Sequence, residues 1–120
     1  MDVALNLATH HTDGILTITV TGELDIATTQ QLLACLDSVF AQLSHHRSEH
    51  NGDQGVNRLA IDTSNVSFID AHGLGVLIAL HGRARRHHIP LHLTAPSPAV
   101  DRLLAITGTH HHFAPLPAQP

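Results

Sequence analysis

The stretch "FIDAHGLGVL", residues 68–77, joins a strand-like segment to the start of a helix. Asp70 stands at the turn, where its carboxylate can cap an unpaired amide of the helix or serve a binding site. Gly73 and Gly75 follow in the first helical turns, and each costs about 0.5–1 kcal/mol relative to Ala in a helix interior. The glycines therefore either let the helix pack tightly on a sheet or leave a bare surface for a partner.

Two segments before this stretch predict a β-hairpin. Apolar residues alternate with polar or small ones over residues 3–8 and 16–20, and an Asp-Gly turn signal lies between them. Apolar residues then recur at helical spacing over 28–43, where Thr28 and Gln31 match a capping box. We expect an amphipathic helix of about four turns over this range.

The rest of the chain alternates between strands and helices. Residues 44–57 are polar, carry two Gly and lack periodicity, so we expect an exposed loop. Ser97 precedes Pro98, and Gly108 closes the same segment, which is the usual punctuation of a helix. The predicted elements after the loop are a strand over 58–62, a turn over 63–67, a helix over 73–87, a strand over 91–94 and a helix over 98–107.

This order, β-β-α-β-α-β-α, predicts one α/β domain with helices packed on a mixed four-stranded sheet. The domain spans residues 1–113, and residues 114–120 form a proline-rich flexible tail. No internal repeat breaks the chain into further units.

Composition excludes several classes of partner. The chain of 120 residues has a net charge of −4, no Lys, no Trp and no Tyr, so it offers neither a basic surface nor aromatic stacking platforms. We therefore expect no nucleic-acid partner and no membrane partner. Cys35 is the single cysteine, and the N-terminus lacks the pattern of a signal peptide, so we expect a cytoplasmic protein.

Three motifs, in the same order along the chain, resemble those of the STAS domain family and its anti-sigma factor antagonists. They are "TGELDIAT" (21–28), "AIDTSNVSFIDAHGLGVLIALHGRAR" (60–85) and "LHLTAPSPAVDRLLAITG" (91–108). The resemblance extends over residues 3–113. It implies a STAS fold for the domain and a regulatory, non-enzymatic function.

The resemblance also implies a partner and a site. In this family the loop typically reads Asp-Ser-Ser-Gly or Asp-Ser-Thr-Gly, and its first Ser is phosphorylated by an anti-sigma factor that is also a serine kinase. The unphosphorylated antagonist binds that partner and so releases a sigma factor. The partner-binding residues carried over to this chain are Asp25, Asp70, Ala71, His72, Gly73, Leu74 and Gly75.

The chain departs from the family at the phosphoacceptor position, which is Ala71 and has no hydroxyl. Either the domain still binds an anti-sigma factor and lacks the phosphoserine switch, or the loop serves another partner. In the second case it is a regulatory or structural subunit of a larger assembly, such as a transporter accessory or a signalling scaffold. Thr63, Ser64 and Ser67 are possible substitute acceptors, although hydroxyls at such turns more often close the turn through hydrogen bonds.

The remaining polar residues give no specific chemical signal. Glu23, Asp25 and Asp70 lack an accompanying nucleophile, so no enzymatic activity is expected. Histidines at 45, 46, 50 and 110–112 lie in segments predicted to be irregular and lack the ligand arrangement of a structural zinc site, so we predict no metal and no cofactor. The expected molecule is a monomer or weak dimer.

Overall fold

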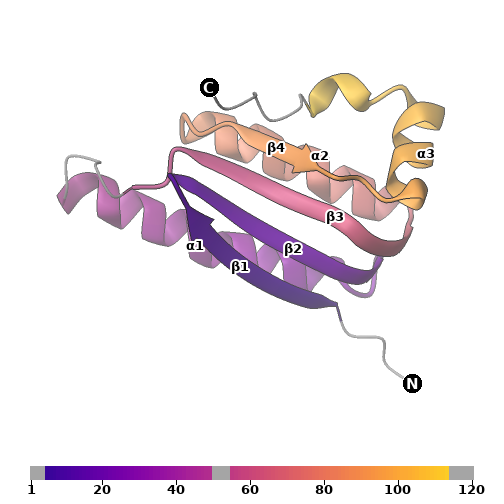
Figure 1. Cartoon of the computed structure of the whole chain (residues 1–120), viewed down its shortest axis with the longest axis horizontal. Coiled ribbons are helices and arrows are strands. Elements are labelled where there is room, and N and C mark those ends of the chain that lie inside the picture. Colours follow the sequence, from indigo (N-terminus) through magenta and orange to yellow (C-terminus); the bar gives the residue numbers. More distant parts are fainter. Residues whose placement is uncertain (1–4, 50–54, 114–120) are drawn as a thin grey trace.

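The computed structural model describes residues 5–49 and 55–113. Four strands and three α-helices alternate along the chain, followed by one short 3-10 helix (Figure 1). The elements are β1 (Asn6–Thr12), β2 (Ile15–Leu24), α1 (Thr29–Glu49), β3 (Arg58–Ile69), α2 (Ala71–Arg86), β4 (Leu91–Thr94), α3 (Pro98–Thr107) and η1 (His110–His112).

The strands form one mixed sheet in the order β1-β2-β3-β4. β1 pairs with β2 antiparallel, while β2 with β3 and β3 with β4 are parallel. The hairpin turn between β1 and β2 consists of Asp13 and Gly14, with φ of 55° and 79°. Two central residues at positive φ match the twist of a two-residue hairpin, which is why Asp-Gly suits this turn. The predicted fold class is confirmed.

β3 is much longer than predicted. The expected strand over 58–62 continues to Ile69, so the predicted turn over 63–67 is wrong. The second half of β3 pairs with the end of β2, from Thr21 opposite Asn65 to Leu24 opposite Ile69, with register shifts on either side of Gly22. Polar residues resembling a turn are held in a strand because these non-local hydrogen bonds satisfy their backbone.

α1 is also longer than predicted. It begins at Thr29 and runs to Glu49, so residues 44–49 of the expected loop over 44–57 are helical. Residues 44–49 contain no Gly or Pro, so no local signal ends the helix at Leu43. The capping box does not form, because the Gln31 side chain accepts from the Leu5 backbone N–H at 3.0 Å.

α3 begins and ends where the sequence predicts. The Ser97 side chain accepts from the Val100 N–H at 3.3 Å, and Gly108 ends α3 in the left-handed region with φ 68°. α3 lies beyond the short strand β4 and contacts β3 (Figure 1). α3 therefore flanks the part of β3 that β4 is too short to reach.

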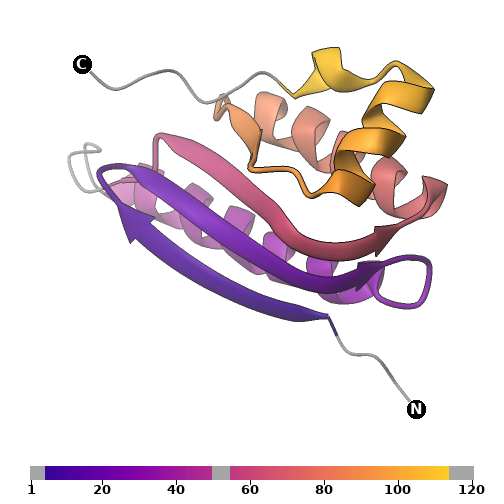
Figure 2. The same ribbon diagram turned by 45° about the vertical axis from the view of Figure 1, so that its right-hand side comes forward.

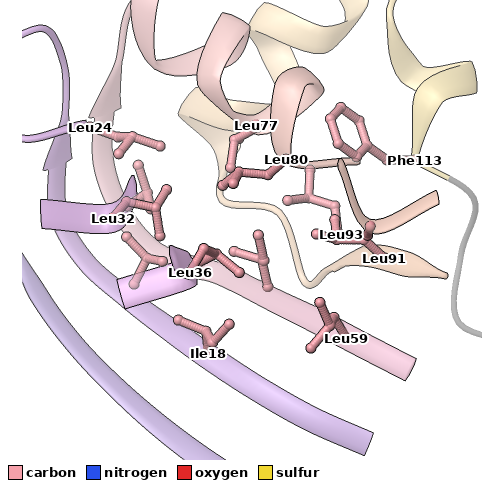
Figure 3. Close-up of a cluster of buried hydrophobic side chains, with 14 of the residues drawn as sticks. Ile18, Leu24, Leu32, Leu36, Leu59, Leu77, Leu80, Leu91, Leu93 and Phe113 are labelled. Atoms are coloured by element: carbon pink, nitrogen blue, oxygen red, sulfur yellow. The ribbon is translucent and has the colours of Figure 1, made fainter. Parts of the chain in front are cut away.

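The core lies between the sheet and the helices. α1 and α2 cover one face of the sheet, behind the strands in the first view (Figures 1 and 2). Arg83 of α2 pairs with Asp37 of α1 and lies 4.7 Å from the Phe40 ring centroid, which links the two helices. The most deeply buried large side chains of the core are Phe40, Ile18, Leu24, Leu32, Leu36, Leu59, Ile61, Leu77 and Leu80. Figure 3 labels Ile18, Leu24, Leu32, Leu36, Leu59, Leu77 and Leu80.

Candidate functional site

The candidate site lies at the end of the sheet where the parallel strands β2 and β3 finish. Leu24 and Ile69, the last residues of these strands, are paired, and the Asp70 N–H donates to the Leu24 carbonyl oxygen at 3.3 Å. The loop after β2 and the junction before α2 are therefore adjacent. Loops at the carboxyl ends of neighbouring parallel strands commonly hold the functional residues of α/β folds.

Asp70 caps the helix, as its position in the sequence predicts. Its backbone is extended, and its carboxylate accepts from the Gly73 N–H at 2.8 Å. The Asp70 carbonyl then accepts from the Leu74 N–H at 3.0 Å, which begins the helical ladder. α2 therefore begins at Ala71, two residues before the predicted start at Gly73.

The two glycines of α2 have different roles. A Cβ atom on Gly73 would lie 2.3 Å from the Leu24 carbonyl oxygen, far inside van der Waals contact. A Cβ atom on Gly75 would meet nothing within 4 Å. Gly73 therefore permits close packing on the sheet, as one alternative predicts, while Gly75 leaves the surface bare and its use by a partner stays a prediction.

Asp25 organises the loop between β2 and α1. Its carboxylate accepts from the Ala27 N–H at 3.0 Å, and its carbonyl accepts from the N–H groups of Thr28 and Thr29. The Thr28 hydroxyl accepts from the Asp25 N–H and donates to the Glu23 carbonyl at 2.7 Å. Asp25 therefore has a local structural role in a loop that stands beside the start of α2.

Large apolar side chains are exposed at the end of the sheet where β2 and β3 finish. Ala71, His72 and Gly75 are exposed on the first turns of α2. Ile26 is 70% exposed and Phe68 is 48% exposed, although both are large apolar residues. Reasoning from the sequence missed these two, because alternation assigns an apolar residue to a face but does not show whether that face is covered.

Three predicted site residues are buried, namely Gly73, Leu74 and Thr63. Leu74 is 5% exposed and belongs to the core, so its side chain gives a partner no surface. Thr63 is fully buried in β3, which excludes it as a substitute phosphoacceptor in this fold. Ser64 and Ser67 are exposed, and the Ser67 hydroxyl donates to the Gly22 carbonyl at 3.4 Å.

The described side chains show neither a metal site nor an activated nucleophile. Among them there is no group of three or more His, Cys, Asp or Glu residues placed to hold a metal ion. The side chains of His45, His46 and His50 fall outside the described set. Burial raises the pKa of the Cys35 thiol, and a protonated thiol is a poor nucleophile. No helix in the described part of the chain is long and apolar enough to cross a bilayer.

The fold and this surface define a small α/β domain that presents the Asp70-capped start of α2 and exposed apolar side chains to solvent. The family model of the STAS domain matches residues 6–119. The chain therefore belongs to the STAS domain family.

Solved structures share this fold at low sequence identity. An anti-sigma factor antagonist from Mycobacterium paratuberculosis is 24% identical, with a TM-score of 0.69 over 95% of this chain and 86% of that one. The anti-sigma factor antagonist SpoIIAA in its unphosphorylated form is 19% identical, with a TM-score of 0.67 over 94% and 88%. SpoIIAA from Bacillus in its phosphorylated form is 18% identical, with a TM-score of 0.62 over 94% and 91%.

A larger protein contains the same fold. SLC26A9 is 20% identical, with a TM-score of 0.60, and the match covers 85% of this chain but 18% of SLC26A9. The fold therefore occurs both as nearly a whole small protein and as a small part of a long one.

Proposed function

We propose that this domain is an anti-sigma factor antagonist that acts without a phosphoserine switch. It binds an anti-sigma factor of the serine-kinase type through the start of α2 and the Asp25 loop, and so releases a sigma factor. It works in the cytoplasm as a monomer or weak dimer, as a binding module and not as an enzyme. Its fold is shared over nearly the full length of two anti-sigma factor antagonists, which supports this role.

The observation that carries the proposal is the position of Ala71. Ala71 is the first residue of α2, directly after the capping Asp70, and it is exposed. The cap, the close packing of Gly73 and the exposed position where the family has its acceptor are all present, while the hydroxyl is absent. The frame that presents this position to a partner is therefore retained, and the group that would receive a phosphate is not.

Loss of the acceptor has a defined consequence for regulation. A phosphoserine adds about −1.5 to −2 charges, which disrupts an interface shaped for a neutral surface. Such a switch typically changes affinity by about 5–150-fold. Because Ala71 accepts no phosphate, ATP and an active kinase should leave this antagonist bound to its partner.

Binding in the presence of ATP tests the proposal. The purified chain is titrated by calorimetry into anti-sigma factors of the serine-kinase type, with and without Mg-ATP, and phosphate incorporation is followed by mass spectrometry. We expect the native chain to bind equally under both conditions and to remain unlabelled. The Ala71→Ser variant should bind without ATP, become phosphorylated at residue 71 and dissociate.

Two outcomes would contradict the proposal. Stoichiometric phosphorylation of the native chain, for example at Ser64 or Ser67, would show that the switch was moved and not lost. Failure of both the native chain and Ala71→Ser to bind any such anti-sigma factor would show that the surface has another partner. Thr109→Ser, on the short loop between α3 and η1, is a control for non-specific labelling, because it adds no acceptor near α2.

A second candidate role is that of a regulatory or structural subunit in a larger assembly, such as a transporter accessory or a signalling scaffold. The fold of this chain recurs within SLC26A9, where it accounts for a small fraction of the length, and this favours the alternative. Co-purification from native cells distinguishes the two roles. Recovery of an anti-sigma kinase supports the first, and recovery of a transport protein or a large multi-subunit complex supports the second.

A further inference from the structure

A cluster of aromatic rings holds the last described residues against α2, far along the helix from Ala71. His81 of α2 meets His112 and Phe113 edge to face, with ring centroids 6.3 and 5.7 Å apart. His111 packs on His112 with centroids 4.3 Å apart. Phe113 is 7% exposed and joins the same core cluster as Leu80, at one side of the close-up (Figure 3). We call residues 110–113 the C-terminal strap.

We propose that the C-terminal strap is a pH-sensitive element, which is docked on α2 when His81 is neutral and released when His81 is protonated. This inference does not depend on the partner of the domain, since it concerns only contacts within the chain. It predicts that acidification alters this part of the molecule without unfolding the sheet.

The charged surroundings of His81 are one-sided. The charges that act on it come from His112 on η1, Arg85 on its own helix and His92 on β4, and in the described part of the chain no acidic group is among them. Asp37 of α1 pairs with Arg83, and Asp101 of α3 lies 3.0 Å from His110. When the strap is docked, protonation of His81 on α2 is therefore disfavoured by the neighbouring positive charges and by the loss of solvent.

The direction of the pH effect follows from this environment. Burial first, then the positive charges of His112, Arg85 and His92, lower the pKa of His81 below its ordinary value of 6.5. The docked form therefore binds fewer protons than the released form as the pH falls below that value. Docking is at full strength above about pH 6.5 and weakens as the pH falls through the lowered pKa.

Two contacts oppose release. A protonated His81 beside the Phe113 ring would gain a cation–π attraction. His110 of the strap also lies 3.0 Å from Asp101 of α3. Burial and the positive charge of His112 act in the other direction, because both disfavour a proton on His81 in the docked form.

Amide hydrogen exchange of the full chain tests the proposal. The Phe113 N–H donates to the His110 carbonyl at 3.0 Å, so its protection factor reports the docked η1. Between about pH 7.5 and pH 5.5 we expect this protection to fall, by up to about tenfold per pH unit for each proton taken up. The Ile61 amide, in the centre of the sheet, should keep its protection over the same range.

Variants assign the effect to the cluster. His81→Phe keeps a ring against Phe113 and removes the titratable imidazole. The pH dependence of the Phe113 protection factor should therefore diminish while docking persists. His112→Gln should act similarly, and it serves as the second variant if His81→Phe does not fold. His11→Gln removes an exposed histidine of β1 and should leave the pH dependence unchanged.

Imidazole titration by NMR completes the test, with the pKa of His81 expected below its ordinary value of 6.5. Protection at Phe113 that does not change with pH would overturn the proposal, as would a parallel fall at Ile61. Unchanged pH dependence in both His81→Phe and His112→Gln would also overturn it.

Discussion

The inward and outward faces of the first two turns of α2 differ in what they tolerate. Inward, Gly73 lies against the Leu24 carbonyl with no room for a methyl group, and Leu74 enters the core. Outward, Ala71 and Gly75 border open space. Packing therefore fixes the residue type on the inner face, whereas only contact with another molecule can constrain the outer face. Under the proposed function, this difference explains how a phosphoacceptor can be lost while the packed inner face persists.

The substitution Gly73→Ala should have the largest effect on stability. The added methyl group would collide with a backbone carbonyl that also accepts from the Asp70 N–H, so neither the helix nor the strand can yield freely. Overpacking of this kind costs about 1–3 kcal/mol. Urea denaturation followed by circular dichroism measures the loss, since the chain has no Trp or Tyr for fluorescence. A variant as stable as the native chain would show that α2 can shift away from β2.

Truncation of the exposed apolar side chains should reduce affinity for the anti-sigma factor without affecting folding. Ile26→Ala and Phe68→Thr remove side chains that are 70% and 48% exposed beside the start of α2. If they anchor the interface, each should weaken binding by about tenfold, or about 1.4 kcal/mol. Stability should stay within about 0.5 kcal/mol, because neither side chain belongs to the core.

Ile106→Ala is the matched control for these two variants. Ile106 is 73% exposed, but it lies on α3, outside the proposed surface. Its truncation should leave the affinity unchanged. Equal losses from all three variants would show that binding is non-specific, and no loss from Ile26→Ala or Phe68→Thr would place the interface elsewhere.

The sequence predicted local structure well and missed structure that depends on distant residues. Local signals predicted the Asp13-Gly14 turn, the Asp70 cap and the Ser97 and Gly108 ends of α3, because each depends on chemistry within a few residues. The continuation of β3 to Ile69 could not be predicted in this way. It depends on pairing with β2 across a register shift, and residues 63–67 carry turn-forming polar side chains.

Within the candidate site, sequence indicated which residues gather but not which way they face. Gly73 and Gly75 are equivalent in the sequence pattern, and only the position of the Leu24 carbonyl distinguishes them. Thr63 resembled Ser64 and Ser67 as a possible acceptor, yet it is buried in the middle of a strand. Ile26 and Phe68 were overlooked because exposure of a large apolar residue is a property of the assembled surface.

Removal of the Asp70 cap should have a smaller effect than the overpacking at Gly73. Asp70→Ala deletes the acceptor of the Gly73 N–H, and loss of an N-cap costs about 1 kcal/mol. Asp70→Asn keeps a side-chain oxygen at the same place and should retain most of this stability, as measured by the same urea titration. If Asp70→Asn is instead as destabilised as Asp70→Ala, the negative charge at the helix start contributes more than the hydrogen bond.

The smallest expected effect is a gain, and it comes from Gly75→Ala. The new methyl group meets no atom within 4 Å, so helix propensity alone should stabilise the chain by about 0.5–1 kcal/mol. Calorimetry should show a rise in Tm of roughly 2–4 °C. The same Gly-to-Ala change two residues earlier should destabilise, so the pair of variants compares the two faces directly. A stabilised Gly75→Ala chain that also binds the anti-sigma factor more weakly would show that the outer face was kept bare for a partner and at the expense of stability.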